Sequence, residues 1–162
     1  IKGGNGSGKS TLIRILLGLT SPSKGEVVFS KPSLNISYLG HKNAIKQHLT
    51  PLQNLELIFS PSDLGDAMTW MQTFGLTKVQ DEMTATLSFG QQKKLALIRV
   101  LGKPSDLIIL DEPFVGLDDL SRDLVSQFLC SRLADGTSLV LTSHIDPAIP
   151  CVELILSEQS ND

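Results

Sequence analysis

Residues 3–10 read GGNGSGKS and match the pattern G-x-x-x-x-G-K-[ST], which is typical of loops that bind nucleotide phosphates. Glycines let successive backbone N–H groups of such a loop point inward around phosphate oxygens, and a helix beginning near Lys9 adds its positive dipole end. We expect the Lys9 ammonium to reach the β- and γ-phosphates and the Ser10 hydroxyl to bind Mg²⁺. A chance glycine-rich turn is the alternative, but chance matches to this pattern are far rarer than one per chain.

Residues 107–112 read LIILDE, an apolar run that ends in two carboxylates. Prolines at 104 and 113 bound the run, which favours a buried strand of a parallel sheet. Because successive side chains diverge at the end of a strand, Asp111 can hold Mg²⁺ while Glu112 faces the γ-phosphate and the attacking water. An acidic pair after a strand can also be a simple turn, but the phosphate loop upstream makes that alternative the weaker one.

Hydrophobic periodicity predicts a single α/β domain over residues 1–162. Strands and helices alternate at both ends of the chain, and the middle is helical, so we expect a helical insertion from about residue 45 to 103. The expected strands are 26–29, 35–39, 107–111, 138–142 and 152–156, and the expected helices are 9–19, 51–59, 64–74, 91–101 and 120 to about 136.

Composition excludes several classes of protein. The net charge is -3, and the basic residues form no stripe of the kind that binds nucleic acid. Cys130 and Cys151 have no metal-binding spacing, so we expect free thiols in a reducing compartment. No apolar run approaches the roughly 18 residues that cross a bilayer, so work at a membrane would need a partner.

Residues 87–92 read LSFGQQ and introduce a third run with helical periodicity. Ser88 and Gly90 at a helix N-terminus form a second candidate anion site. One nucleotide cannot need both this helix start and the phosphate loop unless the two come from different subunits. The alternative is that Ser88 is an ordinary helix cap.

The order of motifs along the chain resembles that of the ATP-binding cassette (ABC) ATPases. The phosphate loop is followed by LSFGQQ, which is similar to that family's LSGGQ signature, and then by ILDEP (109–113), GLD (116–118) and TSH (142–144). The resemblance covers nearly the whole chain. It implies an α/β P-loop NTPase core of the RecA-like class with an inserted helical subdomain.

The resemblance also implies roles for individual residues. Glu112 would be the general base, Asp111 and Ser10 would bind Mg²⁺, and His144 would sense the γ-phosphate. The alternative for His144 is a surface histidine at the end of a strand.

Asp118 would lie at a dimer contact. Across that dimer, Ser88, Gly90 and Gln91 would contact the nucleotide of the other subunit. Phosphates would be bound by the loop and the first helical turn, namely Gly3, Gly4, Asn5, Gly6, Ser7, Gly8, Lys9, Ser10 and Thr11.

Three departures from the family pattern stand out. Phe89 replaces the first glycine of the signature, Gly116 stands where Ala is commoner, and Gly40-His41 occupies the place of the usual glutamine after SYL. The runs 38–55, 87–97 and 110–114 are similar to the ATP-binding subunit of the cytochrome c maturation system, often called a haem exporter. His41 would then couple the γ-phosphate to a membrane partner through the loop 40–50, unless it merely faces solvent.

The resemblance implies a subunit that binds and hydrolyses ATP with Mg²⁺, forms a homodimer, and docks on integral membrane transporter subunits. It would be peripheral on the cytoplasmic face of the inner membrane, or on the matrix face if organellar. A soluble ABC ATPase acting on ribosomes, DNA or Fe–S assembly is one alternative, and a non-hydrolysing nucleotide-binding protein is another.

The phosphate loop begins at residue 3, whereas family members carry two strands and an adenine-stacking aromatic residue ahead of it. We therefore expect that N-terminal strands are missing from this sequence. We also expect that the chain by itself is poorly stable and binds ATP weakly.

Overall fold

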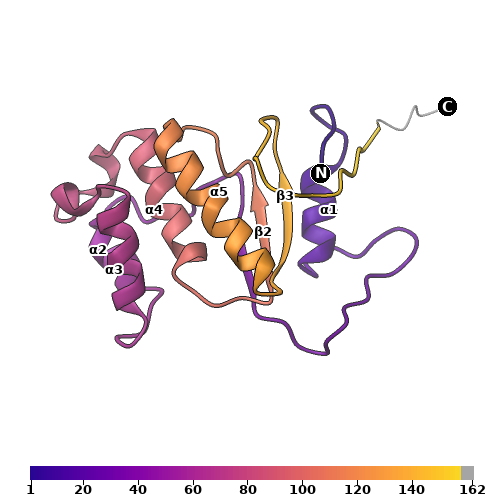
Figure 1. The fold of residues 1–162 in the computed structure, drawn as a ribbon, viewed down its shortest axis with the longest axis horizontal. Coiled ribbons are helices and arrows are strands. Elements are labelled where there is room, and N and C mark those ends of the chain that lie inside the picture. Colours follow the sequence, from indigo (N-terminus) through magenta and orange to yellow (C-terminus); the bar gives the residue numbers. More distant parts are fainter. Residues whose placement is uncertain (158–162) are drawn as a thin grey trace.

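Three parallel strands form the centre of the part of the chain, residues 1–157, that the computed structural model describes. The strands are β1 (Ile36–Leu39), β2 (Leu107–Asp111) and β3 (Ser138–Thr142), and their order in the sheet is β1-β2-β3. β2 pairs with both neighbours along its length. Because all three strands run in one direction, their carboxyl ends meet at the same edge of the sheet (Figure 1).

Helices precede and connect these strands. They are α1 (Lys9–Leu16), α2 (Pro51–Glu56), α3 (Leu64–Thr73), α4 (Phe89–Leu101) and α5 (Asp119–Ala134), with short 3₁₀ turns η1 (Thr77–Val79) and η2 (Thr84–Thr86). α2, α3 and α4 lie between β1 and β2 in the sequence, and α2 and α3 lie at the end of the molecule far from α1 (Figure 1). Within residues 1–157, none of the helices is long and apolar enough to cross a membrane.

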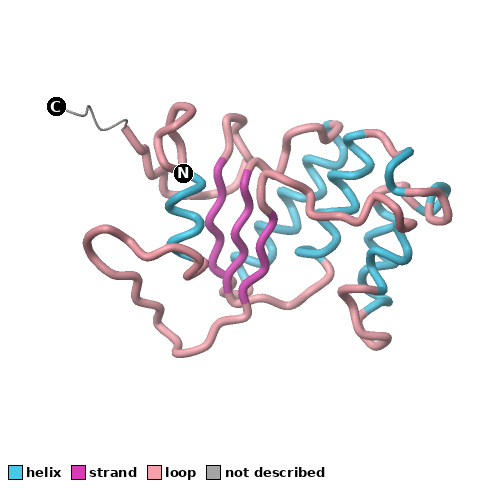
Figure 2. The backbone as a smooth tube through the Cα atoms, turned by 180° about the vertical axis from the view of Figure 1, so that it is seen from behind, coloured by secondary structure: helices cyan, strands magenta, loops and turns pink. Residues whose placement is uncertain are grey.

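Helices cover both faces of β2, and every residue of this strand is buried. Leu107 and Ile109 pack against Ile13 of α1 on one face. Ile108 and Leu110 belong to the larger core, which includes buried residues of α2, α3, α4 and α5. Figure 2 shows α1 on one side of the strands and most of the other helices on the opposite side. Alternate residues of a strand point to opposite faces, so coverage of both faces explains the uninterrupted apolar run of β2.

The structure confirms most of the predicted elements. The strands expected at 35–39, 107–111 and 138–142 are present, and so are the five helices, although the one expected over 51–59 ends at Glu56 and the one expected over 9–19 ends at Leu16. The helix expected over 91–101 begins earlier, at Phe89. The α/β class is therefore confirmed. The division into a core and a helical subdomain over 45–103 stays a prediction.

Two predicted strands are wrong or incomplete. Residues 26–29 form no strand within the described chain, and Val28 there is 78% exposed. A segment of strand-forming residues needs a neighbouring strand to pair with. None of the three strands of the sheet pairs with residues 26–29. Of residues 152–156, only Ile155 forms a bridge, in parallel pairing with Lys2. Its two hydrogen bonds join Lys2 to Leu154 and Leu156 at 2.8 Å each.

Candidate functional site

The phosphate loop lies at the carboxyl edge of the sheet and leads directly into α1. Gly8 is the N-cap of α1, and as a glycine it has no side chain that could accept hydrogen bonds from the helix. The first N–H groups of α1 can therefore donate to an anion. Gly3 packs too tightly for any side chain, because a Cβ there would lie 2.4 Å from Ser7 Oγ and 2.7 Å from the Leu156 carbonyl oxygen. A side chain at position 3 would therefore displace Ser7 or the backbone at Leu156, so the conformation of the loop requires glycine there.

Lys9 supplies the positive charge of the loop. Its ammonium donates hydrogen bonds to the carbonyl oxygens of Gly3 (2.7 Å) and Gly4 (2.8 Å). These two bonds hold the lysine against the loop and leave one of the three ammonium donors free for a phosphate oxygen.

Asp111 ends β2 beside the phosphate loop and is only 6% exposed. The Ser10 hydroxyl donates to Asp111 Oδ2 at 3.5 Å, and the Thr142 hydroxyl donates to Asp111 Oδ1 at 2.7 Å. Thr142 is the last residue of β3 and is completely buried. A neighbouring strand thus fixes one oxygen of the carboxylate and leaves the other beside Ser10.

Glu112 adopts a left-handed backbone conformation, with φ at 51°, which costs a non-glycine residue on the order of 1–3 kcal/mol. Its backbone N–H donates to the Thr142 hydroxyl at 3.0 Å and contacts the Thr142 carbonyl oxygen at 3.2 Å. This turn, rather than the pleat of the strand, separates the side chain of Glu112 from that of Asp111. Strain of this kind is commonest at functional sites.

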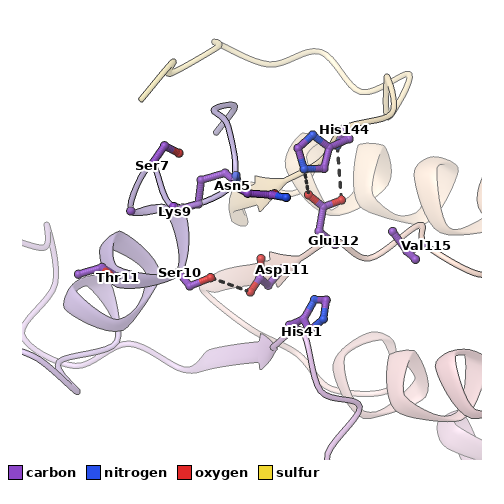
Figure 3. Close-up of a pocket in the computed structure, with 12 residues that line it drawn as sticks. Asn5, Ser7, Lys9, Ser10, Thr11, His41, Asp111, Glu112, Val115 and His144 are labelled. Atoms are coloured by element: carbon purple, nitrogen blue, oxygen red, sulfur yellow. Dashed lines mark hydrogen bonds and ion pairs between the residues drawn. The ribbon is translucent and has the colours of Figure 1, made fainter. Parts of the chain in front are cut away.

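The turned Glu112 side chain faces His144, the third residue of the TSH motif (Figure 3). The His144 backbone N–H donates to Glu112 Oε2 at 3.4 Å, and His144 Nε2 lies 3.4 Å from Glu112 Oε1. Oε1 accepts no hydrogen bond from the residues that the structure describes, although it is buried. A buried carboxylate oxygen without a donor is expensive, so this atom is suited to accept a proton or a hydrogen bond from a bound water.

A cavity of about 460 Å³ brings these groups together at the carboxyl edge of the sheet (Figure 3). His41, two residues beyond the end of β1, reaches the same cavity from the opposite side of Asp111. All of the predicted phosphate, metal and catalytic residues on this side of the proposed dimer line the cavity except Gly3 and Gly4. The lining residues are Asn5, Gly6, Ser7, Gly8, Lys9, Ser10, Thr11, His41, Asp111, Glu112, Val115 and His144.

The signature residues do not line this cavity. Ser88 is the N-cap of α4 and forms a capping box with Gln91: its hydroxyl accepts from the Gln91 backbone N–H at 3.2 Å, and its own N–H donates to Gln91 Oε1 at 2.8 Å. Asp118 likewise caps α5 and pairs with Lys94 at 2.6 Å. The Lys94 ammonium and donors from Ser121 hold the pKa of Asp118 well below its usual range.

Two residues near the cavity escaped the sequence analysis. Thr142 was expected to lie in a strand and to begin the TSH motif but was assigned no role, yet its hydroxyl joins Asp111 to the Glu112 backbone. Lys93 of α4 is 3% exposed; burial lowers the pKa of its ammonium, whereas the charges of Asp111 and Glu112 act in the opposite direction. A usable signal was present, because Lys93 stands at helical spacing from buried Leu97 and Val100.

The donors at the cavity fit Mg²⁺. The Ser10 hydroxyl and the Asp111 carboxylate are hard oxygen ligands, and their oxygens lie 3.5 Å apart. Residues 1–157 contain no group of three or more His, Cys, Asp or Glu side chains that could hold a metal ion. Mg²⁺ at phosphate-binding sites is usually held by one or two side chains, the substrate phosphates and water, so two protein ligands are sufficient.

The geometry agrees with comparisons with known proteins. The family model described as ABC transporter matches residues 1–115. The chain belongs to the ABC transporter family, as an ATP-binding domain. It is 38% identical over 155 residues to the cytochrome c biogenesis ATP-binding export protein CcmA of Idiomarina loihiensis, an alignment covering 89% of this chain and 71% of that protein.

Solved ABC structures share the fold. The ATP-binding subunit of an ABC transporter superposes with a TM-score of 0.79 and 25% identity, over 89% of this chain and 66% of that one. The dimeric bacterial ABC transporter cassette MJ0796 gives a TM-score of 0.75 and 25% identity, over 88% of this chain and 72% of that one. The ABC ATPase fold expected from the motifs is therefore confirmed.

The Thr142 hydroxyl can be tested by replacement with valine, which keeps the shape of the side chain. In Thr142→Val, Asp111 Oδ1 loses its buried donor, so the free energy of unfolding should fall by about 1–3 kcal/mol. ATP hydrolysis should fall at least tenfold, because Asp111 and Glu112 both lose their support. Denaturant titration and a phosphate-release assay measure the two effects.

Thr137→Val is the matched control for that experiment. It also removes a threonine hydroxyl that donates a hydrogen bond, to the Ser105 carbonyl oxygen, but Thr137 does not line the cavity. Its hydrolysis rate should match that of the parent chain. Equal hydrolysis rates in the two variants would show that Thr142 does not support the carboxylates.

Proposed function

We propose that this chain is the ATP-binding and ATP-hydrolysing subunit of an ABC transport complex that serves cytochrome c biogenesis, with haem or a related species as cargo. The observation that carries the proposal is the cavity in which the phosphate loop, Asp111, Glu112 and His144 meet. The similarity to CcmA proteins supports the finer assignment.

ATP would bind with its phosphates against the backbone N–H groups of the loop and the start of α1. The Lys9 ammonium would neutralise charge on the β- and γ-phosphates, and Ser10 and Asp111 would hold Mg²⁺. Mg²⁺ held by these two residues would supply positive charge to offset the charge that develops on the phosphate oxygens. Its hydrogen bonds to the Gly3 and Gly4 carbonyl oxygens hold the Lys9 ammonium in place before ATP binds.

Glu112 would orient the attacking water and take its proton. The left-handed turn at Glu112 and the His144 backbone N–H fix the carboxylate at the edge of the cavity, with Oε1 free of hydrogen bonds within the described chain. The His144 imidazole, 3.4 Å from Oε1 and 60% exposed in its side chain, would donate to the γ-phosphate. Water attack in line with the leaving oxygen then releases phosphate and ADP.

The second half of the site would come from another copy of the chain. The cavity of the chain itself is not lined by Ser88, Gly90, Gln91 or Asp118. In the family, the residues at the positions of Ser88 and Gly90 contact the partner's nucleotide. Two copies would therefore enclose two ATP molecules. The dimeric MJ0796 cassette is a precedent for such an arrangement in this family.

The complex would lie at the cytoplasmic face of the inner membrane, or at the matrix face of an organelle, through integral membrane subunits. The loop 40–50 would carry the coupling. Arg99 of α4 donates to the Ala44 carbonyl oxygen at 2.8 Å, and the buried Asn54 of α2 bonds to both the backbone N–H and carbonyl of Lys46, at 2.7 and 2.9 Å. A shift of His41 in the cavity would thus be transmitted to α2 and α4.

Glu112→Gln tests the catalytic assignment. The amide can hold a water molecule but cannot accept its proton, so Mg-ATP binding should persist while turnover falls by about 10²-fold or more, and ATP-bound dimers should accumulate. The control is Glu82→Gln, the same substitution at an exposed position outside the cavity. Single-turnover hydrolysis and size-exclusion chromatography with ATP give the answer. Near-parental hydrolysis by Glu112→Gln would remove Glu112 from the role of base.

His41 tests the assignment to a transporter. His41→Ala should leave ATP binding by the isolated subunit nearly intact but abolish the stimulation of hydrolysis by co-purified membrane subunits. His41→Gln should restore part of the stimulation, because an amide can replace the hydrogen bonds of a neutral imidazole. ATPase rates with and without those subunits are the measurement. Equal stimulation in all three proteins would refute a coupling role, and failure of any membrane protein to co-purify would favour a soluble ABC ATPase.

A further inference from the structure

Two of the departures from the family pattern touch each other in the structure. Gly116 has a φ of 82°, and a Cβ at this position would lie 2.4 Å from Cε1 and 2.5 Å from Cδ1 of the Phe89 ring. A Cβ on neighbouring Gly90 would lie 2.7 Å from the Gly116 carbonyl oxygen. The Phe89 ring therefore occupies the space that a side chain at position 116 would need.

A second contact joins the same two segments. Lys94, one turn further along α4, pairs with Asp118 at 2.6 Å, and its side chain is only 16% exposed. Asp118 also caps α5 by accepting from the Ser121 backbone N–H at 2.8 Å. Two contacts therefore hold the start of α4 against the loop 116–118. The Phe89 ring packs on the backbone at Gly116, and Lys94 forms an ion pair with Asp118. Figure 1 shows the N-terminal ends of both helices close together.

Phe89 is unusual for a surface residue. Its side chain is large and apolar, yet the residue is 60% exposed, and it follows Ser88 directly at the first position of α4. Nothing in the core of the fold requires an aromatic residue there, because the buried residues of α4 begin at Lys93. The contact with Gly116 is the structural consequence of having phenylalanine at this position.

We infer that Phe89 is a positioning residue matched to Gly116: its ring sets the loop 116–118 relative to Ser88 on the face that meets a second copy of the chain. This inference rests on the proposed dimeric function. The mechanism is steric, because the ring and a side chain at 116 exclude each other. Replacing only one member of the pair should therefore misplace Asp118 relative to Ser88, and replacing both should correct the misplacement.

A double-mutant cycle tests the inference in the Glu112→Gln chain, with ATP-dependent dimerisation measured by sedimentation equilibrium. Gly116→Ala should weaken dimerisation about tenfold or more, which is the size of effect expected where two residues in contact are coupled. Adding Phe89→Gly to Gly116→Ala should recover most of that loss. Monomer ATP binding should be unchanged throughout, which a general loss of folding would not allow. Losses that simply add in the double variant would overturn the matched pair.

Gly136→Ala is the control for backbone strain. Gly136 has a similar φ of 89°, but no described atom lies within 4 Å of a Cβ there. Its substitution should lower the melting temperature as Gly116→Ala does while leaving dimerisation within about twofold of the parent. Equal weakening of the dimer by both substitutions would assign the effect to strain alone.

The outcome in which the Glu112→Gln chain forms no dimer with ATP would contradict the proposed dimeric function. The position of the loop is then measured in the monomer by amide hydrogen exchange at Leu117, whose N–H donates to the Phe114 carbonyl oxygen, and at Ser121, whose N–H donates to Asp118. Phe89→Gly should accelerate exchange there about tenfold while exchange in β2 stays unchanged. Unaltered exchange at both residues would overturn the positioning role independently of dimerisation.

Discussion

The burial of β2 on both faces is the constraint on which the rest of the structure depends. Helices on each side accept its alternating side chains, and parallel pairing with β1 and β3 fixes its register. The strand ends next to the phosphate loop, where Asp111 accepts a hydrogen bond from Ser10 at the start of α1. Asp111 and Glu112 at the end of this strand lie near the N-terminal end of α1 and the buried Lys93. These positive groups reduce the free-energy cost of burying the two carboxylates.

A single threonine connects this architecture to the chemistry. Thr142 lies opposite Asp111 in the sheet, and its hydroxyl binds both the Asp111 carboxylate and the Glu112 backbone. The same strand end leads within two residues to His144, which faces Glu112. The relative positions of the proposed metal ligand Asp111, the proposed base Glu112 and His144 thus follow from the pairing of β2 with β3. Few mobile groups need to be ordered when a substrate arrives.

The sequence predicted those parts of the fold and site that depend on local patterns. The phosphate loop, the apolar run of β2 and the signature helix each carry enough information in a few residues to be placed correctly. The left-handed turn at Glu112 was not predictable, because it results from the pairing of Thr142 with residues 30 positions away. The role of Thr142 was missed for the same reason, because its contacts with Asp111 and Glu112 are a property of packing. Lys93 differs, because its helical spacing from buried Leu97 and Val100 was a usable signal. Residues 26–29 have strand-like composition but no pairing partner in the described chain, so local propensity gave the wrong answer.

We propose above that the loop 3–10 and the ends of β2 and β3 bind Mg-ATP through its phosphates. Two-dimensional NMR of the chain during titration with Mg-ATP tests it most directly, because each backbone amide reports separately. We predict that the largest shifts occur at residues 4–11 and at Asp111, Glu112 and His144, and that Lys9→Ala abolishes them. Shifts confined to other parts of the chain, or shifts that persist unchanged in Lys9→Ala, would contradict the account.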